Sequence, residues 1–122
     1  MKKEESRRQK QVASLIKENL GRLILETFRD SINTLITISK VEMTKDLKIA
    51  YVYVSFFGGG EDPDSVLIKI KEKSSHLRKM VASVTKLKYN PQLIFFLDLS
   101  HEENEKIDRL IELIKKDEKK SG

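Results

Sequence analysis

The segment that most restricts the fold is residues 47–57, which predict a β-strand with two apolar faces. Its alternating positions form two apolar sets, which are Leu47, Ile49, Tyr51 and Tyr53 on one face and Ala50, Val52, Val54 and Phe56 on the other. A strand with one solvated face alternates apolar and polar residues, whereas a strand buried on both sides reads as continuously apolar. Residues 47–57 are therefore predicted to be the central strand of a sheet.

The residues before this strand predict its hairpin partner and a long helix. Residues 35–43 are rich in Ile, Val and Thr, and Thr44, Lys45 and Asp46 separate them from the central strand, as in a β-hairpin. Residues 7–28 carry apolar side chains at spacings of three and four, the pattern of an amphipathic helix, with Ser6 as its N-cap. The apolar residues of this helix are Val12, Leu15, Ile16, Leu20, Leu23, Ile24 and Phe28.

After the central strand, the sequence predicts a bent pair of helices. Three glycines at positions 58–60 end the strand, and Asp62 and Pro63 provide an N-cap and a first-turn proline. Residues 65–90 then form a helical tract broken at Ser74 and Ser75, where we expect two helices to meet and a serine hydroxyl to cap the second one. The residues expected to face the core are Leu67, Ile70, Leu77, Met80, Val81, Val84 and Leu87.

The last part of the chain predicts a third strand and a C-terminal helix. Pro91 opens the strand at residues 92–99, and a crossover of about thirty residues is long enough to make it parallel to the central strand. Ser100 and Glu103 form a capping box for a helix over residues 100–118, whose apolar positions are Ile107, Leu110, Ile111 and Ile114. The expected fold is α+β, a single domain over residues 1–122 in the order α-β-β-α-bend-α-β followed by a C-terminal helix, with residues 1–6 as a disordered arm and 119–122 as a disordered tail.

The positive charge of the chain is concentrated in two places. Residues 65–90 hold seven basic residues against one acid, a net charge of +6 that exceeds the +5 of the whole chain. Residues 1–11 add +3, whereas residues 101–122 net −1. A local basic surface favours a polyanionic partner of defined shape.

Ten residues are candidates for nucleic-acid binding: Arg7, Arg8, Lys10, Lys73, Ser74, Ser75, Arg78, Lys79, Lys86 and Lys88. Lys79 and Lys86 are seven residues apart, which places them two turns apart on one helix face and lets them follow phosphates. The same residues could form an ordinary solvated helix face. The three near the N-terminus could be a flexible basic arm or only a solubilising terminus.

Other kinds of site are disfavoured. The glycines at 58–60 lack a following Gly-Lys-Ser/Thr and precede acidic residues, so a plain loop is favoured over a nucleotide site. Tyr51 and Tyr53 could stack bases, but core or core-edge positions are favoured. With no cysteine and two histidines, we expect no disulfide, metal, cofactor, small-molecule substrate or catalytic site. We expect no membrane span and no export signal, and a reducing cytoplasm.

The predicted order of elements is that of the type II KH fold, and the chain resembles the ribosome-binding factor A family. The residues that carry the resemblance are Arg8, Gln9 and Gln11-Val12-Ala13; Val41-Glu42-Met43 with Asp46-Leu47; Val52-Tyr53-Val54-Ser55; Leu77-Arg78; and Pro91-Gln92-Leu93-Ile94-Phe95-Phe96 with Asp98 and Ser100. The resemblance implies a non-catalytic cytoplasmic factor, monomeric off the ribosome, that binds 16S rRNA and the immature small (30S) ribosomal subunit during late maturation. The alternative is a protein adaptor that docks the basic surface onto an acidic partner.

The chain departs from the family pattern at two positions. The family commonly has Ala-x-Gly at its helix bend, where this chain has Lys73-Ser74-Ser75, and Asp-Pro-Arg after its first helix, where this chain has Asp30-Ser31-Ile32. The Gly-x-x-Gly loop with which KH domains approach phosphates is also missing at residues 74–77. Recognition by charge and shape is therefore expected, rather than base-by-base reading.

Overall fold

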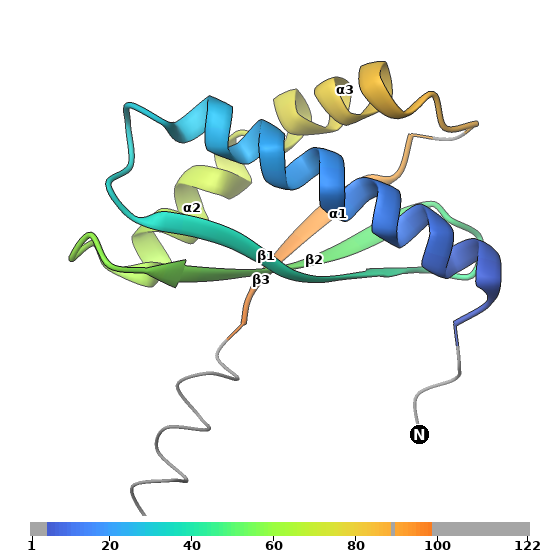
Figure 1. Cartoon of the computed structure of the whole chain (residues 1–122), viewed down its shortest axis with the longest axis horizontal. Helices are drawn as coiled ribbons and strands as arrows, with labels where there is room; N and C mark the ends of the chain where they lie inside the picture. Colours follow the sequence, from blue (N-terminus) through green and yellow to red (C-terminus); the bar gives the residue numbers. More distant parts are fainter. Residues whose placement is uncertain (1–4, 89, 99–122) are drawn as a thin grey trace, which may run out of the picture.

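The residues that the structure describes form two α+β layers, with three helices on one side of a three-stranded sheet (Figure 1). The computed structural model describes residues 5–88 and 90–98. Its elements are α1 (Arg7–Phe28), β1 (Leu35–Met43), β2 (Ile49–Phe57), α2 (Pro63–Glu72), α3 (Ser74–Thr85) and β3 (Gln92–Leu97). The predicted order α-β-β-α-bend-α-β is confirmed, and the predicted C-terminal helix at 100–118 lies outside the described residues, as do residues 1–4 of the predicted arm.

The sheet has the order β1-β2-β3, so β2 is central as its two apolar faces predicted. It pairs antiparallel with β1 and parallel with β3, which confirms the crossover expected from the long α2–α3 connection. A bulge interrupts the β1–β2 register between Ile38 and Lys40. Strand β2 is two residues shorter at its start than predicted, because Leu47 belongs to the hairpin turn.

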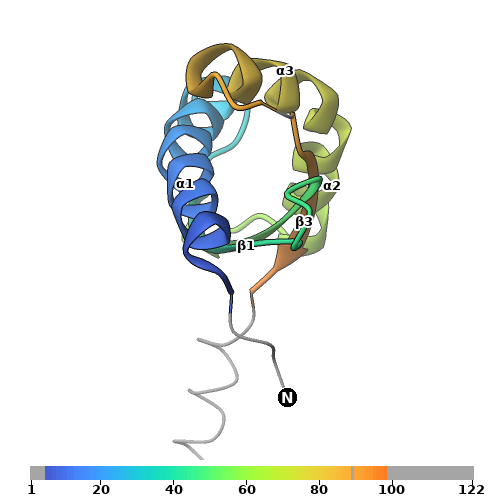
Figure 2. The ribbon, with the colours of Figure 1, turned by 90° about the vertical axis from the view of Figure 1, so that its right-hand side faces the viewer.

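The core lies between the sheet and the helices, which form an arch over it (Figure 2). The inward side chains of β2 are completely buried, and so are the central apolar residues of all three helices. The residues with no exposed surface are Ile16, Leu20, Ala50, Val52, Val54, Val66, Ile70 and Leu77. The long amphipathic helix α1 closes the core because its apolar stripe contacts both β1 and α3.

The start of α1 is fixed by a complete capping box, as its sequence predicted. Ser6 Oγ accepts from the Gln9 amide at 3.1 Å, and the Ser6 amide donates to Gln9 Oε1 at 2.8 Å. Gln9 also donates from Nε2 to the Met43 carbonyl at 3.0 Å, so the first helical turn is attached to the end of β1. Arg7, Arg8 and Lys10 are therefore part of this helix, and the flexible-arm interpretation of these three residues is wrong.

The structure confirms the predicted pair of helices with a bend between them, but three details of that prediction are wrong. The break falls at Lys73, whose amide bonds the Ile70 carbonyl at 3.0 Å, and no serine hydroxyl caps α3. Helix α3 ends at Thr85 instead of running to residue 90, because Lys86 takes a left-handed conformation with φ of 52°. Val84, expected in the core, is 47% exposed near this early end.

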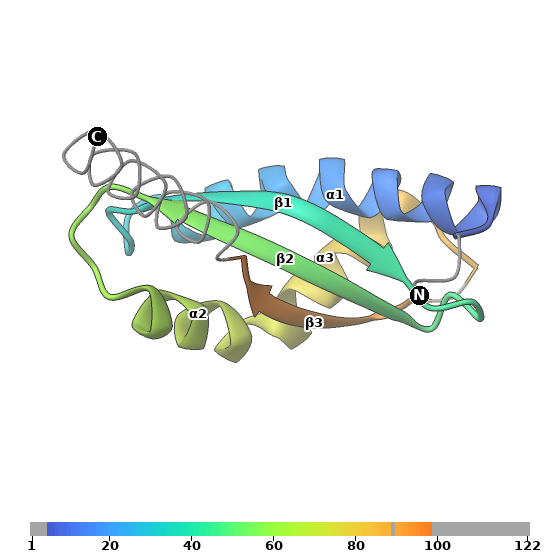
Figure 3. The ribbon, with the colours of Figure 1, turned by 90° about the horizontal axis from the view of Figure 1, so that it is seen from below.

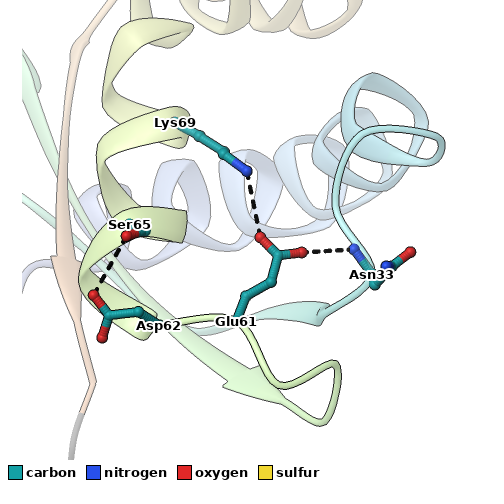
Figure 4. A network of polar contacts seen from close by, with 5 residues as sticks. All are labelled: Asn33, Glu61, Asp62, Ser65 and Lys69. Atoms are coloured by element: carbon teal, nitrogen blue, oxygen red, sulfur yellow. Dashed lines mark hydrogen bonds and ion pairs between the residues drawn. The ribbon is translucent and has the colours of Figure 1, made fainter.

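A polar network joins the α1–β1 loop to the start of α2 (Figure 4). Glu61 accepts from the Asn33 amide at 2.9 Å and pairs with Lys69 at 3.3 Å. The hydrogen bond from Asn33, together with Lys69, lowers the pKa of Glu61 below its ordinary value. Asp62 occupies the predicted N-cap position, but its carboxylate accepts from Ser65 Oγ at 3.3 Å and makes no capping bond to the backbone.

Gly59 lies in this region at a position where the Cβ of any other residue would clash with its surroundings. It has a φ of 78°, and a Cβ at this position would lie 2.5 Å from Thr34 Oγ1 and 2.8 Å from the Thr34 backbone. Thr34 is buried, so it has little room to move. The glycine run thus allows the loop after β2 to pack directly against the end of the α1–β1 loop.

Candidate nucleic-acid interface

One residue from each of the two basic groups predicted from the sequence lines a hollow at one end of the molecule. Arg8, from the first turn of α1, and Lys88, from the α3–β3 connection, line a cleft of about 150 Å³. Its floor is apolar and is formed by Val12, Leu47 and Leu87. We call this hollow the basic cleft. It joins segments eighty residues apart in the chain, a meeting that the sequence pattern did not predict.

The backbone around the basic cleft carries unusual conformations. Only two non-glycine residues among those described have a positive φ, and these are Leu47 at 62° and Lys86 at 52°. Leu47 lines the cleft, and Lys86 immediately precedes the lining residues Leu87 and Lys88. A side chain in the left-handed region costs of order 1 kcal/mol, and such residues tend to gather at functional sites.

The charges at the start of α1 also oppose the electrostatics of the helix. The amino end of a helix carries a partial positive charge and favours acidic side chains. The first turn of α1 has no acidic residue and instead begins with Arg7 and Arg8. Arg8 and the helix amino end therefore add their positive potentials beside the basic cleft, which suits an anionic ligand.

Arg78 has a structural role that the sequence interpretation missed. Its Nε donates to the Pro91 carbonyl at 3.2 Å and its Nη2 to the Asn90 carbonyl at 2.7 Å. These bonds fasten the end of the α3–β3 connection to α3, so Arg78 helps to position Lys88. The only sequence signal for this role is the type of side chain, because guanidinium suits paired carbonyl acceptors.

The structure does not bring all ten candidates together. Lys10 faces away from Arg8 and lines a separate hollow with Lys17 and Lys40 beside β1. Lys73, Ser74 and Ser75 lie at the α2–α3 junction. The predicted ridge of Lys79 and Lys86 on one helix face is wrong, because the helix ends before Lys86.

Two larger hollows lie elsewhere and contain none of the ten candidates. They measure about 330 and 420 Å³, share Leu25 and Ile36, and run between α1 and β1. Their lining is mainly apolar, so they offer little to a polyanion. In the parts of the chain that the structure describes, no three His, Asp or Glu side chains gather to hold a metal ion, and no helix has the length and apolar character to cross a membrane.

Comparison with known proteins identifies the family. The sequence profile of ribosome-binding factor A matches residues 8–111, which is most of the chain. The chain belongs to the ribosome-binding factor A family. The family resemblance carried by the sequence motifs is thereby confirmed.

Curated ribosome-binding factor A proteins match over nearly their whole length. The protein of Pelagibacter ubique is 38% identical over 109 residues, which cover 87% of this chain and 88% of the relative. The protein of Caldanaerobacter subterraneus is 33% identical over 104 residues, covering 84% and 85%. The protein of Vibrio campbellii is 33% identical over 122 residues, covering 98% and 90%.

Solved structures of ribosome-binding factor A share the fold. The solution structure of a putative member from Thermotoga maritima superposes with a TM-score of 0.62 at 26% identity, covering 78% of this chain and 91% of that one. The crystal structure from Thermus thermophilus gives a TM-score of 0.64 at 21% identity, covering 73% and 94%. The KH-like fold expected from the element order is thus confirmed. This member of the family forms its helix bend without a glycine, through Lys73 with φ of −96° and ψ of 7°.

Proposed function

We propose that this protein is a non-catalytic assembly factor that binds 16S rRNA on the immature small ribosomal subunit in the cytoplasm, during late maturation and as a monomer. The match to ribosome-binding factor A over residues 8–111 carries this proposal. A homology model of the Thermus thermophilus protein, which shares the fold with a TM-score of 0.61 over 71% of this chain and 91% of that one, has been fitted into a cryo-EM map of a 30S complex. That assembly supports the small subunit as the target here.

The basic cleft is the part of the surface that we assign to RNA. Arg8 and Lys88 line one hollow. Arg7 precedes Arg8 directly, and Lys86 is two positions before Lys88. Phosphates that contact these cations release their condensed counterions, and this release drives binding. The rigid attachment of α1 to β1 by Gln9 and of the α3–β3 connection to α3 by Arg78 sets the spacing of the cations.

Recognition rests on charge and shape. KH domains that read single strands use glycines to bring backbone amides to the phosphates. Residues 74–77 supply no glycine, and the α2–α3 junction turns at Lys73 instead. The mechanism that follows is conformational: the cations hold a mobile part of the rRNA in one geometry, and the factor leaves when the maturing subunit holds that geometry by itself.

The test is binding of charge-reversal variants to immature small subunits. Arg8→Glu with Lys88→Glu reverses both cations of the basic cleft, whereas Lys10→Glu with Lys17→Glu makes the same change in net charge on another side of α1. Co-sedimentation at about physiological salt, with transfer RNA as competitor, should show saturable binding of the wild type at one copy per subunit. We expect the cleft variant to lose at least about tenfold in affinity and the control variant far less.

Two results would overturn the proposal. Equal binding by the cleft and control variants, with native melting curves for both, would remove the basic cleft from the interface. Recovery of a single protein partner from a nuclease-treated complex, with no binding to subunits, would replace the assembly-factor function by the adaptor function.

A further inference from the structure

One face of the sheet points away from the helices (Figure 3). The residues on this face include a group of aromatic and aliphatic side chains. Tyr53 stacks on Phe96, with ring centroids 5.4 Å apart, and the ring of Tyr51 is tilted against Phe96 with centroids 5.9 Å apart. Ile94 is next to them, opposite Tyr51 in the β2–β3 register. We call Tyr51, Tyr53, Ile94 and Phe96 the aromatic face.

Beyond the polar pair of Thr37 and Ser55, the same side of the sheet exposes two more large apolar side chains at its end. Leu35 and Phe57 are register partners, and they are 53% and 44% exposed. Phe96 is 40% exposed, whereas the inward residues of β2 are completely buried. Half of the large apolar side chains that the described structure leaves exposed therefore belong to one side of one sheet, which is the signature of a contact surface.

The charge on this side of the sheet does not suit a polyanion. Lys40 forms an ion pair with Glu42, and its Nζ also lies 5.7 Å from the centre of the Tyr53 ring. The register places both charged residues opposite the tyrosines, so the centre of the face carries one base and one acid. An apolar occupant fits such a surface better than a phosphate backbone does.

The end of the described chain is well placed to supply this occupant. The Asp98 amide donates to the Val54 carbonyl at 2.7 Å, so the chain remains on the sheet until it leaves β3 beside the aromatic face. Residues 99–122 follow, and the sequence predicts a helix at 100–118. Such a helix is about 28 Å long, close to the roughly 30 Å of the nine-residue strand β2.

We propose that residues 100–118 form an amphipathic helix that packs on the aromatic face. Its apolar positions recur at spacings of three and four and are Ile107, Leu110, Ile111 and Ile114. Ile107 is about 10 Å along the helix from Ser100, a distance of roughly three strand residues, which brings it over the tyrosines when the helix runs back along the sheet. The helix gives the sheet a second covering layer and is independent of the basic cleft, so this inference stands apart from the proposed function.

The test uses the full chain and aromatic NMR resonances. Ile111→Asp places a charge on the apolar side of the helix, whereas Arg109→Gln changes the net charge by the same amount on its polar side. We expect Ile111→Asp to shift the ring resonances of Tyr51, Tyr53 and Phe96 and Arg109→Gln to leave them unchanged. Ile111→Ala, which keeps helix propensity, should shift the same resonances in the same direction.

Three outcomes overturn the inference. Unchanged ring resonances in both Ile111 variants would show that the helix does not cover the face. Ring resonances that depend on protein concentration would show that a second copy of the chain covers it. A single-stranded RNA that moves the ring resonances of the wild type, where Ile111→Asp does not, would make the face a base-stacking platform.

The chain contains no cysteine, so a disulfide introduced by Tyr51→Cys with Leu110→Cys gives a second measurement, and a monomeric cross-linked product supports the proposal.

Discussion

At the scale of single residues, Lys86 combines a positive charge that we assign to RNA binding with a backbone conformation that glycine adopts more easily. Its φ of 52° ends α3, and most helices that end in this way use glycine. We expect Lys86→Gly to raise the free energy of unfolding by about 0.5 to 1 kcal/mol, because it relieves the left-handed strain. Urea denaturation measures this difference.

The matched control for this prediction is Lys86→Ala, which removes the same charge and keeps the strain. Both variants should weaken RNA binding equally, and only the glycine variant should be more stable than the wild type. Equal stability of the two variants would show that the conformation of Lys86 costs nothing.

Gly59 shows how a close contact differs from a backbone preference. Gly58 has a similar φ of 69°, but nothing lies within 4 Å of the Cβ that a substitution would add there. At Gly59 the added Cβ would meet Thr34 at 2.5 Å. We expect Gly59→Ala to lower the free energy of unfolding by about 2 kcal/mol more than Gly58→Ala does, because both carry the strain and only one carries the clash. Thermal melts of the two variants side by side measure the difference, and equal melting temperatures would contradict it.

At the scale of elements, the connection between α3 and β3 depends on Arg78. The two hydrogen bonds to the Pro91 and Asn90 carbonyls need the forked guanidinium, which lysine cannot reproduce. We expect Arg78→Lys to cost about 1 kcal/mol of stability and to accelerate amide hydrogen exchange in residues 86–88 while the net charge stays constant. Lys79→Arg, one position along α3, is the control. Unchanged exchange in residues 86–88 of Arg78→Lys would contradict a positioning role.

The elements also show what the sequence could predict. The sequence predicts helix α1 with its observed bounds and strand β2 to within two residues at its start, because each is defined by a long run of apolar residues with one period, and Ser6 marks the start of α1. The predicted end of α3 is wrong because the apolar spacing continues through Val84 to Leu87. No glycine or other typical helix-ending residue indicates the left-handed conformation at Lys86. Lysine has a high intrinsic helix propensity, so the end of helix α3 before Lys86 must come from tertiary packing and not from the local residue type.

The basic cleft was half predictable for the same reason. The sequence gives the residue types and the local excess of positive charge, and Arg8 and Lys88 were both among the candidates. Their meeting depends on the packing of α1 against α3, which brings together residues eighty positions apart. The separation of Lys10 from Arg8 was in principle predictable, because the side chains of helical residues two positions apart point in directions that differ by about 200°.

At the scale of the whole molecule, three acidic residues lie at the end of the helical layer opposite the basic cleft. The basic cleft lies where α1 begins, and the acidic residues Glu61, Asp62 and Asp64 lie where α2 begins, at the far end of the sheet (Figure 1). Such a charge distribution orients a protein in the field of a polyanion before contact, so that the cationic end arrives first. Within this acidic group, Glu61 is paired with Lys69 and accepts a hydrogen bond from Asn33, and Asp62 accepts one from Ser65.

This polarity makes salt dependence the most informative property of the whole protein. If about six phosphates are neutralised, the logarithm of the binding constant should fall with the logarithm of salt concentration with a slope of about −4 to −5. Removing two phosphate contacts by Arg8→Gln with Lys88→Gln should make the slope less steep by about 1.5. The control is Lys10→Gln with Lys17→Gln, which lowers the net charge equally and should leave the slope near that of the wild type. Titrations of a 16S rRNA fragment at four or more salt concentrations measure all three slopes. If both variants reduce the slope equally, binding follows the net charge and not the basic cleft, because only a localised contact can distinguish two variants of the same charge.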